Sequence, residues 1–484
     1  GGPHLEVASQ HAVAHTGTSR SNRRTLMSSR SYGKSGLVYE QLATGSRNNS
    51  AIYGASAAAY LLATTKWGSY AGIAPIFVAD LLIAAAFWQM LTARQESNRA
   101  ERPVLTTTQV ALLLALPLWA TVRLLASESY GFNTFRDYAP YLYASVALIA
   151  AMGVSRSTSL QRQRTARMLW MALLFHLAWT LAVVIVPDLP SALPVIGNGV
   201  RLFSPREDID SAYLGVTATI ALYRWSVSRK KSYLLVALTS IATVLQISSR
   251  AGLIATFLCL IIAAYLIVRN SRASVPIALA ATLGPIALIV SFNWLLQLPA
   301  IARLIATAWP SLVPDAEDGY ASAQGTTDAR RQAWSAAIQY TNQAWDRSIF
   351  GSGFGSDFMA ESGAARLLLG PLAADSGVRS PHNYFIGSYA RLGLIGLCII
   401  ITLAVASLII VVVARRLLAS EELGVLISAV VVAVIPTALF GVTLESPFGS
   451  IPFFWAVGAL FGYSRLVTEH TSSSGRPKHR GISA

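Results

Sequence analysis

Basic residues are concentrated in every second polar segment of this chain, where apolar stretches separate one polar segment from the next. Arg and Lys cluster in segments 89–103, 155–168, 228–232, 269–273 and 414–422, whereas the segments between hold few basic residues, at isolated positions. This alternation is the positive-inside pattern of a multi-pass membrane protein, because short cytoplasmic loops retain positive charge. It predicts an all-α integral membrane protein. It also leaves a few arginines and one histidine on the outer side, where a positive charge needs another explanation.

The composition agrees with a membrane protein and argues against a nucleic-acid-binding one. Hydrophobic residues make up 54% of the 484 residues, charged residues only 13%, and the mean hydropathy is +0.50, values too apolar for a soluble chain of this length. Most of the net charge of +15 lies in the predicted inner loops and the N-terminal tail, where anionic lipid headgroups are the natural partner. We therefore expect membrane lipids as partners and no nucleic acid.

About twelve apolar stretches are suited to crossing a bilayer, which takes about 20 residues and fewer where the bilayer adapts. We predict spans over 50–66, 71–92, 105–126, 137–154, 166–187, 209–227, 231–247, 250–268, 274–297, 388–413, 422–443 and 450–467. With the basic loops inside, both termini are cytoplasmic. The predicted organisation is a disordered basic cytoplasmic tail over 1–49, helices one to nine over 50–297, a large outer loop over 298–387, helices ten to twelve over 388–467, and a cytoplasmic tail over 468–484.

The long outer loop is the main feature outside the predicted spans. Leu298–Pro381 exceeds 80 residues and is too long for a passive connector. Within it we expect an amphipathic helix over Thr327–Trp345, lying along the membrane interface, and a Gly-rich turn at Gly351–Gly355. A second, shorter outer loop is Pro187–Asp208. One large folded loop above a helical bundle indicates an enzyme or receptor that works at the outer leaflet.

Four outward-facing residues are candidates for a site in which a phosphorylated substrate reacts. Arg250 lies at the outer end of a span, Arg330 and Arg331 lie on the expected loop helix, and His382 lies where the loop re-enters the membrane. Guanidinium groups bind phosphate in a bidentate manner, at about 1.5–3 kcal/mol for each charge-assisted contact, so a few of them would hold a diphosphate. An imidazole with an ordinary pKa near neutrality would take a proton from an attacking hydroxyl.

Each of these residues also has an ordinary structural interpretation. An arginine at the end of a span usually reaches toward lipid headgroups, and arginines on a loop helix are usually solvated. His382 follows a proline and would then simply cap the next helix. The functional interpretation therefore depends on whether residues far apart in sequence converge in space.

Other charged residues rank second. Arg123 and Arg136 flank an outer loop and, with Arg201, are secondary candidates for phosphate contacts. Asp80 lies inside a predicted span without an evident partner, and Arg224, at the end of another, is expected to be structural or to reach toward headgroups.

The sequence does not indicate a metal or a cofactor. A metal-dependent transferase of this plan would need closely spaced carboxylates at the outer face, and the first outer loop, Lys66–Tyr70, has none. The acidic clusters at Glu207–Asp208 and Asp315–Asp318 are interpreted as solvated. No Walker loop, CxxC motif or GxSxG motif with triad partners occurs. We therefore expect metal-independent chemistry in which arginines neutralise the leaving group.

Several segments together resemble the superfamily of O-antigen ligases and polymerases of the bacterial inner membrane. Their order, their spacing and the large loop between them fit over roughly residues 240–400. The segments are Ser248–Gly252, Asp328–Trp334, Ile349–Gly355, Pro381–Phe385 and Arg391–Gly396.

The resemblance implies a GT-C-like membrane glycosyltransferase that moves a glycan from undecaprenyl pyrophosphate to an acceptor at the periplasmic face, with inversion and without a cofactor. The essential arginines of the family would fall on Arg250 and Arg330 and its histidine on His382. A shift of one residue would place Arg331 in the role of Arg330. The expected protein is a monomer in the inner membrane, with its active site facing the periplasm.

The two enzyme activities of this superfamily, ligase and polymerase, differ in the acceptor that they use. A ligase passes the glycan to lipid A–core, and a polymerase passes it to another lipid-linked glycan. A polymerase commonly has two sizeable outer loops, and since Pro187–Asp208 is modest, the sequence favours the ligase. Two alternatives of other classes are a transporter for a lipid-linked glycan and a receptor or scaffold for envelope assembly, in which His382 would be dispensable.

Overall fold

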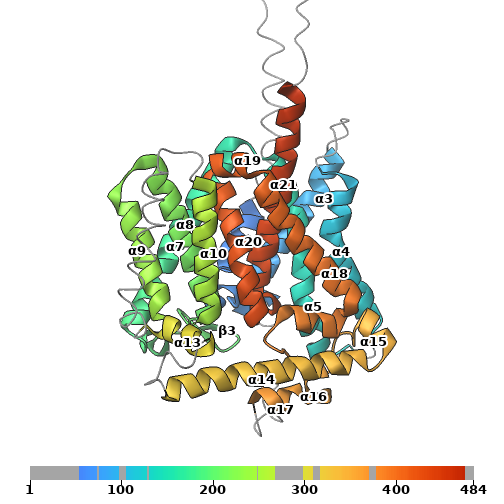
Figure 1. Ribbon diagram of the computed structural model, residues 1–484. Coiled ribbons are helices and arrows are strands. Elements are labelled where there is room, and N and C mark those ends of the chain that lie inside the picture. Colours follow the sequence, from blue (N-terminus) through green and yellow to red (C-terminus); the bar gives the residue numbers. More distant parts are fainter. Residues whose placement is uncertain are drawn as a thin grey trace, which may run out of the picture. The chain divides into compact units, whose positions relative to one another are not determined.

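The computed structural model describes residues 54–73, 76–96, 105–127, 130–247, 249–267, 298–308, 317–369 and 378–474, which belong to one compact unit spanning Arg47–Ala484. These residues are mostly helical, so the prediction of an all-α membrane protein is confirmed in outline (Figure 1). The first predicted tail, residues 1–49, and the predicted span 274–297 lie outside the described residues.

The helices before the long loop are α2 (Lys66–Ser69), α3 (Val78–Glu96), α4 (Thr107–Leu125), α5 (Phe132–Leu142), η1 (Tyr143–Ser145), α6 (Val146–Arg156), α7 (Ser159–Ile185), η2 (Leu189–Ala192), α8 (Glu207–Ser228), α9 (Lys231–Gln246) and α10 (Arg250–Ile267). The long loop contains α13 (Pro299–Ala308), α14 (Glu317–Asn342), α15 (Trp345–Phe350), α16 (Phe358–Glu361) and α17 (Ala364–Leu369). The chain continues through α18 (Tyr384–Val413), α19 (Arg415–Ser420), α20 (Glu422–Phe440), η6 (Thr443–Glu445) and α21 (Pro447–Ser474). Two short antiparallel pairs complete the fold: β1 (Gly72–Ile73) with β2 (Ile76–Phe77), and β3 (Val195–Gly197) with β4 (Val200–Arg201).

Within the described residues, six helices are long and apolar enough to cross a membrane. They are Thr107–Leu125, Phe132–Arg156, Ser159–Ile185, Arg250–Ile267, Tyr384–Val413 and Glu422–Phe440, and each coincides with a predicted span. Shorter apolar helices cover Val78–Thr92 and Lys231–Gln246, at two further predicted spans. The chain is thus a multi-pass membrane protein, and twelve spans stay a prediction.

Two predicted boundaries were wrong. The segment 155–168, expected to be a loop, is largely the first part of α7, because Thr158 and Gln161 form a capping box that starts the helix at Ser159. The amphipathic helix of the long loop begins at Glu317 instead of Thr327 and ends at Asn342. Trp345 begins a separate helix, because Ala344 has extended backbone angles.

Small residues allow the central helices to pack closely. A Cβ atom on Gly252 of α10 would lie 2.2 Å from the Ser211 Cβ of α8, and one on Gly215 of α8 would lie 2.8 Å from the Thr256 Cα of α10. Small residues at such crossings let helix backbones approach each other in membranes. Gly252 therefore fixes the position of the first turn of α10, where Arg250 lies.

Helix α18 is broken at Gly393, whose φ of 67° lies in the left-handed region. The break frees backbone carbonyls, and these accept hydrogen bonds from the Gly351 turn: Ser352 N donates to Ala390 O at 2.7 Å and Gly353 N to Arg391 O at 3.0 Å. A Cβ on Gly393 would lie 2.2 Å from Ile349 O. The glycine-containing segments Gly351–Gly355 and Arg391–Gly396 thus contact each other, and this contact provides hydrogen-bond donors for the backbone carbonyls that the broken helix exposes.

Two arginines at the α19 end of the bundle pair with glutamates, and Asp80, in the first turn of α3, has a hydrogen-bond donor. Arg162 donates to both carboxylate oxygens of Glu421 at 2.7 Å. Arg224 binds Glu422 at 2.8 Å and lies over the Trp170 ring, so its role is structural. Asp80, for which the sequence showed no partner, accepts a hydrogen bond from the Tyr143 hydroxyl at 2.8 Å.

Candidate active site

A cavity of about 620 Å³ lies where the starts of α8 and α10, the helices α13 and α14 and the turn before α18 meet. In Figure 1, α14 runs across this end of the bundle, opposite α19. We call this space the basic cavity. Its lining consists of Lys66, Pro205, Arg206, Glu207, Asp208, Ser249, Arg250, Ala251, Ile254, Arg303, Leu304, Thr327, Arg330, Arg331, Trp334, His382, Phe440 and Gly441. The four candidates that rank first in the sequence, Arg250, Arg330, Arg331 and His382, are all among them.

Helix α14 connects the arginines of the basic cavity. Arg250, the first residue of α10, donates from Nη1 to Thr327 Oγ1 of α14 at 2.8 Å. Arg330 of α14 donates from Nη1 to the carbonyl of Phe440, the last residue of α20, at 2.9 Å. Arg331 also lines the cavity, with an exposed side chain. A helix of the long loop thus holds the ends of two membrane helices around one space.

The cavity is strongly positive. Six basic side chains line it, against the two carboxylates of Glu207 and Asp208. Asp208 accepts a hydrogen bond from Arg206 Nε at 2.9 Å, which neutralises part of this charge. Burial and the neighbouring Arg250 lower the pKa of Arg330, so its charge is only partly compensated. Such a cavity favours a ligand that carries more than one negative charge.

Sequence reasoning did not single out Lys66, Arg206 and Arg303 as site residues. All three line the basic cavity, and each comes from a segment that the sequence places outside. Their predicted position on the outer side was the one sequence feature that pointed to them, and it is not specific, because Arg201 shares it and lies outside the cavity.

His382 is half-buried and has a φ of 56°, an uncommon backbone conformation for a side chain other than glycine. It does not cap α18, since Asn383 does so, its Oδ1 accepting from Phe385 N at 3.0 Å and Ile386 N at 3.1 Å. Burial, followed by the charges of Arg330 and Arg206, lowers the pKa of His382 to about 4. The imidazole is therefore neutral near pH 7 and able to accept a proton, although its pKa is lower than the near-neutral value expected from the sequence.

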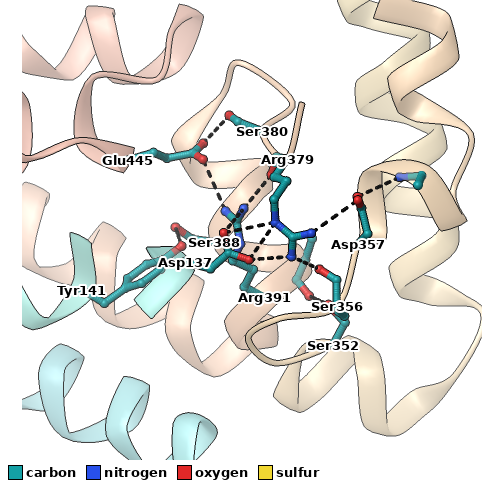
Figure 2. Close-up of polar contacts among 12 residues, drawn as sticks. Asp137, Tyr141, Ser352, Ser356, Asp357, Arg379, Ser380, Ser388, Arg391 and Glu445 are labelled. Atoms are coloured by element: carbon teal, nitrogen blue, oxygen red, sulfur yellow. Dashed lines mark hydrogen bonds and ion pairs between the residues drawn. The ribbon is translucent and has the colours of Figure 1, made fainter. Parts of the chain in front are cut away.

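Figure 2 shows a network of buried ion pairs. Its charged residues line a cavity of about 220 Å³ together with His382. Arg379 donates from Nη2 to Asp137 Oδ2 at 2.8 Å, and Arg391 Nη2 lies 3.6 Å from Asp137 Oδ1. Arg391 also binds Glu445 at 3.3 Å, and Glu445 accepts from the Ser380 hydroxyl at 2.7 Å. Side chains from α5, α18, η6 and the end of the long loop are thereby joined, with Asp137, Arg379 and Arg391 each less than 10% exposed.

This network fixes the turn that carries His382. The Ser380 hydroxyl, held by Glu445, accepts a hydrogen bond from the His382 backbone N at 3.1 Å. Arg391 Nη2 donates to the Arg379 carbonyl at 2.6 Å, and the Trp334 indole of α14 donates to the Pro381 carbonyl at 2.6 Å. The turn is therefore anchored on both sides, which holds His382 at the edge of the basic cavity.

The secondary candidates lie elsewhere. Arg136 lines a different cavity of about 220 Å³, next to the ion-pair network. Arg201 lies outside both cavities and donates to the backbone carbonyls of Ser191 and Leu193 at 2.6 and 3.0 Å. Arg123 donates to the Gly351 carbonyl at 3.1 Å and so supports the Gly-rich turn. In the part of the chain that the structure describes, no three His, Cys, Asp or Glu side chains gather as a metal-binding group would.

Residues 234–401 match the family model described as O-antigen ligase. The match supports the resemblance to the superfamily of O-antigen ligases and polymerases that the motifs indicated, over this part of the chain. The members of this family are membrane glycosyltransferase-like enzymes. The matched segment contains Arg250, Arg330 and His382, whereas Asp137 and Glu445 of the ion-pair network lie outside it. The comparison with curated proteins found no match.

Proposed function

We propose that this protein is an O-antigen ligase that transfers a glycan from undecaprenyl diphosphate to lipid A–core at the periplasmic face of the bacterial inner membrane. The observation that carries the proposal is the common location of Arg250, Arg330 and His382 in one strongly basic cavity. These residues are separated by up to 132 positions in the sequence, and the family match covers all three.

In the proposed reaction, Arg250 and Arg330 bind the diphosphate of the donor, with Arg331 as a further contact. The acceptor hydroxyl oxygen forms a bond to the anomeric carbon, and the bond between that carbon and the diphosphate oxygen breaks. The electron pair of the broken bond goes to the diphosphate, whose developing charge the guanidinium groups stabilise. The hydroxyl proton goes to the His382 imidazole. A single displacement of this kind inverts the anomeric centre and requires no metal.

Binding of the donor would also change the pKa of His382. Arg330 and Arg206 are the charges that lower the pKa of His382, after burial. A diphosphate in the basic cavity would offset these charges, which raises the pKa of the imidazole toward its ordinary value. His382 would therefore become a better proton acceptor once the donor is in place.

A polymerase is the alternative within the superfamily. The ligase is favoured because the second outer segment holds only η2 and the β3–β4 hairpin before α8 begins at Glu207. A lipid-linked glycan transporter would also bind a diphosphate, but it would not form a glycosidic bond.

The test is glycan transfer by the purified protein from an undecaprenyl-diphosphate-linked glycan, with lipid A–core or a second lipid-linked glycan as acceptor. We expect transfer to lipid A–core, loss of transfer in His382→Ala and Arg250→Ala, and full transfer in the control Arg201→Ala. Activity should persist in EDTA, and a loss that a divalent ion restores would contradict the metal-free mechanism. Transfer to the lipid-linked glycan alone would identify a polymerase. Full activity in both His382→Ala and Arg250→Ala would contradict the proposed site.

A further inference from the structure

The second cavity, of about 220 Å³, meets the basic cavity at His382. Its lining comes from α5, the end of the long loop, α18 and the segment around η6. Of the described residues that line these two cavities, His382 is the one common to both. His382 therefore borders two different spaces.

The two cavities differ in their chemistry. The second cavity is lined by three arginines, Arg136, Arg379 and Arg391, and by the two carboxylate residues Asp137 and Glu445. Its charge is therefore almost balanced, whereas the basic cavity has six cations against two carboxylates. An almost balanced set of donors and acceptors suits a neutral ligand rich in hydroxyl groups better than a diphosphate.

Several groups of the second cavity have hydrogen-bonding capacity left for a ligand. Each carboxylate oxygen of Glu445 accepts one hydrogen bond, from Ser380 or Arg391, and a carboxylate oxygen can accept two. Arg391 is 4% exposed, and its Nε has no hydrogen-bond partner among the described residues. A buried donor without a partner is costly, so a ligand that supplies an acceptor there would be stabilised.

The volume limits the size of the ligand. Pockets for drug-sized ligands usually measure about 300–1,000 Å³, so a cavity of about 220 Å³ fits a smaller group such as one sugar ring. Tyr141 adds an aromatic wall, with its hydroxyl 3.0 Å from Ser388 Oγ. Arg136, which is exposed, lines the cavity from α5.

We propose that the second cavity binds the terminal sugar of the acceptor and presents one of its hydroxyl groups to His382, while the donor diphosphate occupies the basic cavity. This proposal rests on the proposed function. The acceptor oxygen then bonds to the anomeric carbon as the diphosphate leaves with the bonding electron pair, and its proton passes to His382. The shared chemistry is a sugar hydroxyl, whether it belongs to lipid A–core or to a second lipid-linked glycan.

The test uses a reciprocal pair of variants that fill one cavity each. Val442 lines the second cavity and Leu304 the basic cavity, and both are apolar and half-buried. We expect Val442→Trp to raise the KM for lipid A–core at least about tenfold, while the Kd for undecaprenyl diphosphate stays within about twofold of the wild-type value. Leu304→Trp should do the reverse. The same measurements with a lipid-linked glycan as acceptor distinguish the two sources of the sugar.

A second variant keeps the test decisive if Val442→Trp fails to fold. Arg136→Ala removes an exposed side chain, and it should raise the acceptor KM without changing the Kd for undecaprenyl diphosphate. Arg201→Ala, an exposed arginine outside both cavities, is the control and should change neither. Transfer by the wild type with an unchanged acceptor KM in Val442→Trp and Arg136→Ala would overturn this proposal alone. Absence of both transfer and diphosphate binding in the wild type would overturn the proposed function.

Discussion

The buried pair of Arg379 and Asp137 allows a quantitative test of the structure, because Arg379 also binds a more exposed carboxylate. The side chain of Asp137 is 4% exposed and lies 2.8 Å from Arg379 Nη2, whereas that of Asp357 is 41% exposed and lies 3.3 Å from Arg379 Nη1. Asp137→Asn keeps the shape but removes the charge that faces two buried guanidinium groups, those of Arg379 and Arg391. Removing one partner of a buried pair costs about 3–5 kcal/mol. Asp357→Asn should cost about 0–1 kcal/mol, as for an exposed pair.

The assay is thermal unfolding of the purified protein in detergent, with Asp137→Asn and Asp357→Asn measured beside the wild type. At roughly 2 °C for each kcal/mol, Asp137→Asn should lower the Tm by roughly 6–10 °C, and Asp357→Asn by no more than about 2 °C. The variant Asp137→Asn should also lose transfer activity at temperatures where it is folded, since the network positions the His382 turn. Equal Tm values for the two variants would show that the pair of Arg379 and Asp137 does not stabilise the fold more than an exposed pair does.

Two further predictions concern the base and the broken helix. The neutral form of His382 accepts the proton, and its pKa is lowered to about 4, so kcat/KM should be lost only as the pH falls toward about 4. Arg330→Gln removes a neighbouring positive charge and should therefore move this loss of kcat/KM to higher pH. A pH–rate profile checks both; a loss of kcat/KM centred at pH 6.5 or above in the wild type would contradict the assignment. Gly393→Ala and Gly363→Ala both place a side chain at positive φ, at a cost of about 1–2 kcal/mol. The two positions differ in their surroundings: a Cβ on Gly363 would have no atom within 4 Å, whereas a Cβ on Gly393 would lie 2.2 Å from Ile349 O. Thermal unfolding should therefore show a clearly larger loss of stability for Gly393→Ala, and an equal loss would contradict the close contact between α18 and the Gly351 turn.

The sequence was sufficient to predict a helical membrane protein and to select those residues of the basic cavity that lie within recognisable motifs. The alternation of basic segments assigned Arg250, Arg330 and His382 to one side, and sidedness together with the motifs was enough to predict that they meet. The ion-pair network was not predictable in this way. Asp137 lies in a predicted span and Arg379 lies 242 positions later in a loop, so no local pattern connects them.

The boundaries of α14 show a different limit. Residues 317–326 contain Gly, Ser and Thr and few large apolar residues, so their intrinsic helix preference is weak and the predicted helix began at Thr327. In the structure the helix starts at Glu317. Local propensity alone therefore underestimates the length of the helix that carries Arg330.

A structure of the protein with undecaprenyl diphosphate bound would show whether the basic cavity is the site of glycan transfer. We predict that the diphosphate lies between the guanidinium groups of Arg250 and Arg330. The His382 imidazole should lie beside its terminal phosphate, the one that carries the glycan in the donor. A diphosphate bound at the α19 end of the bundle, or out of reach of both arginines, would rule out the basic cavity as the donor site.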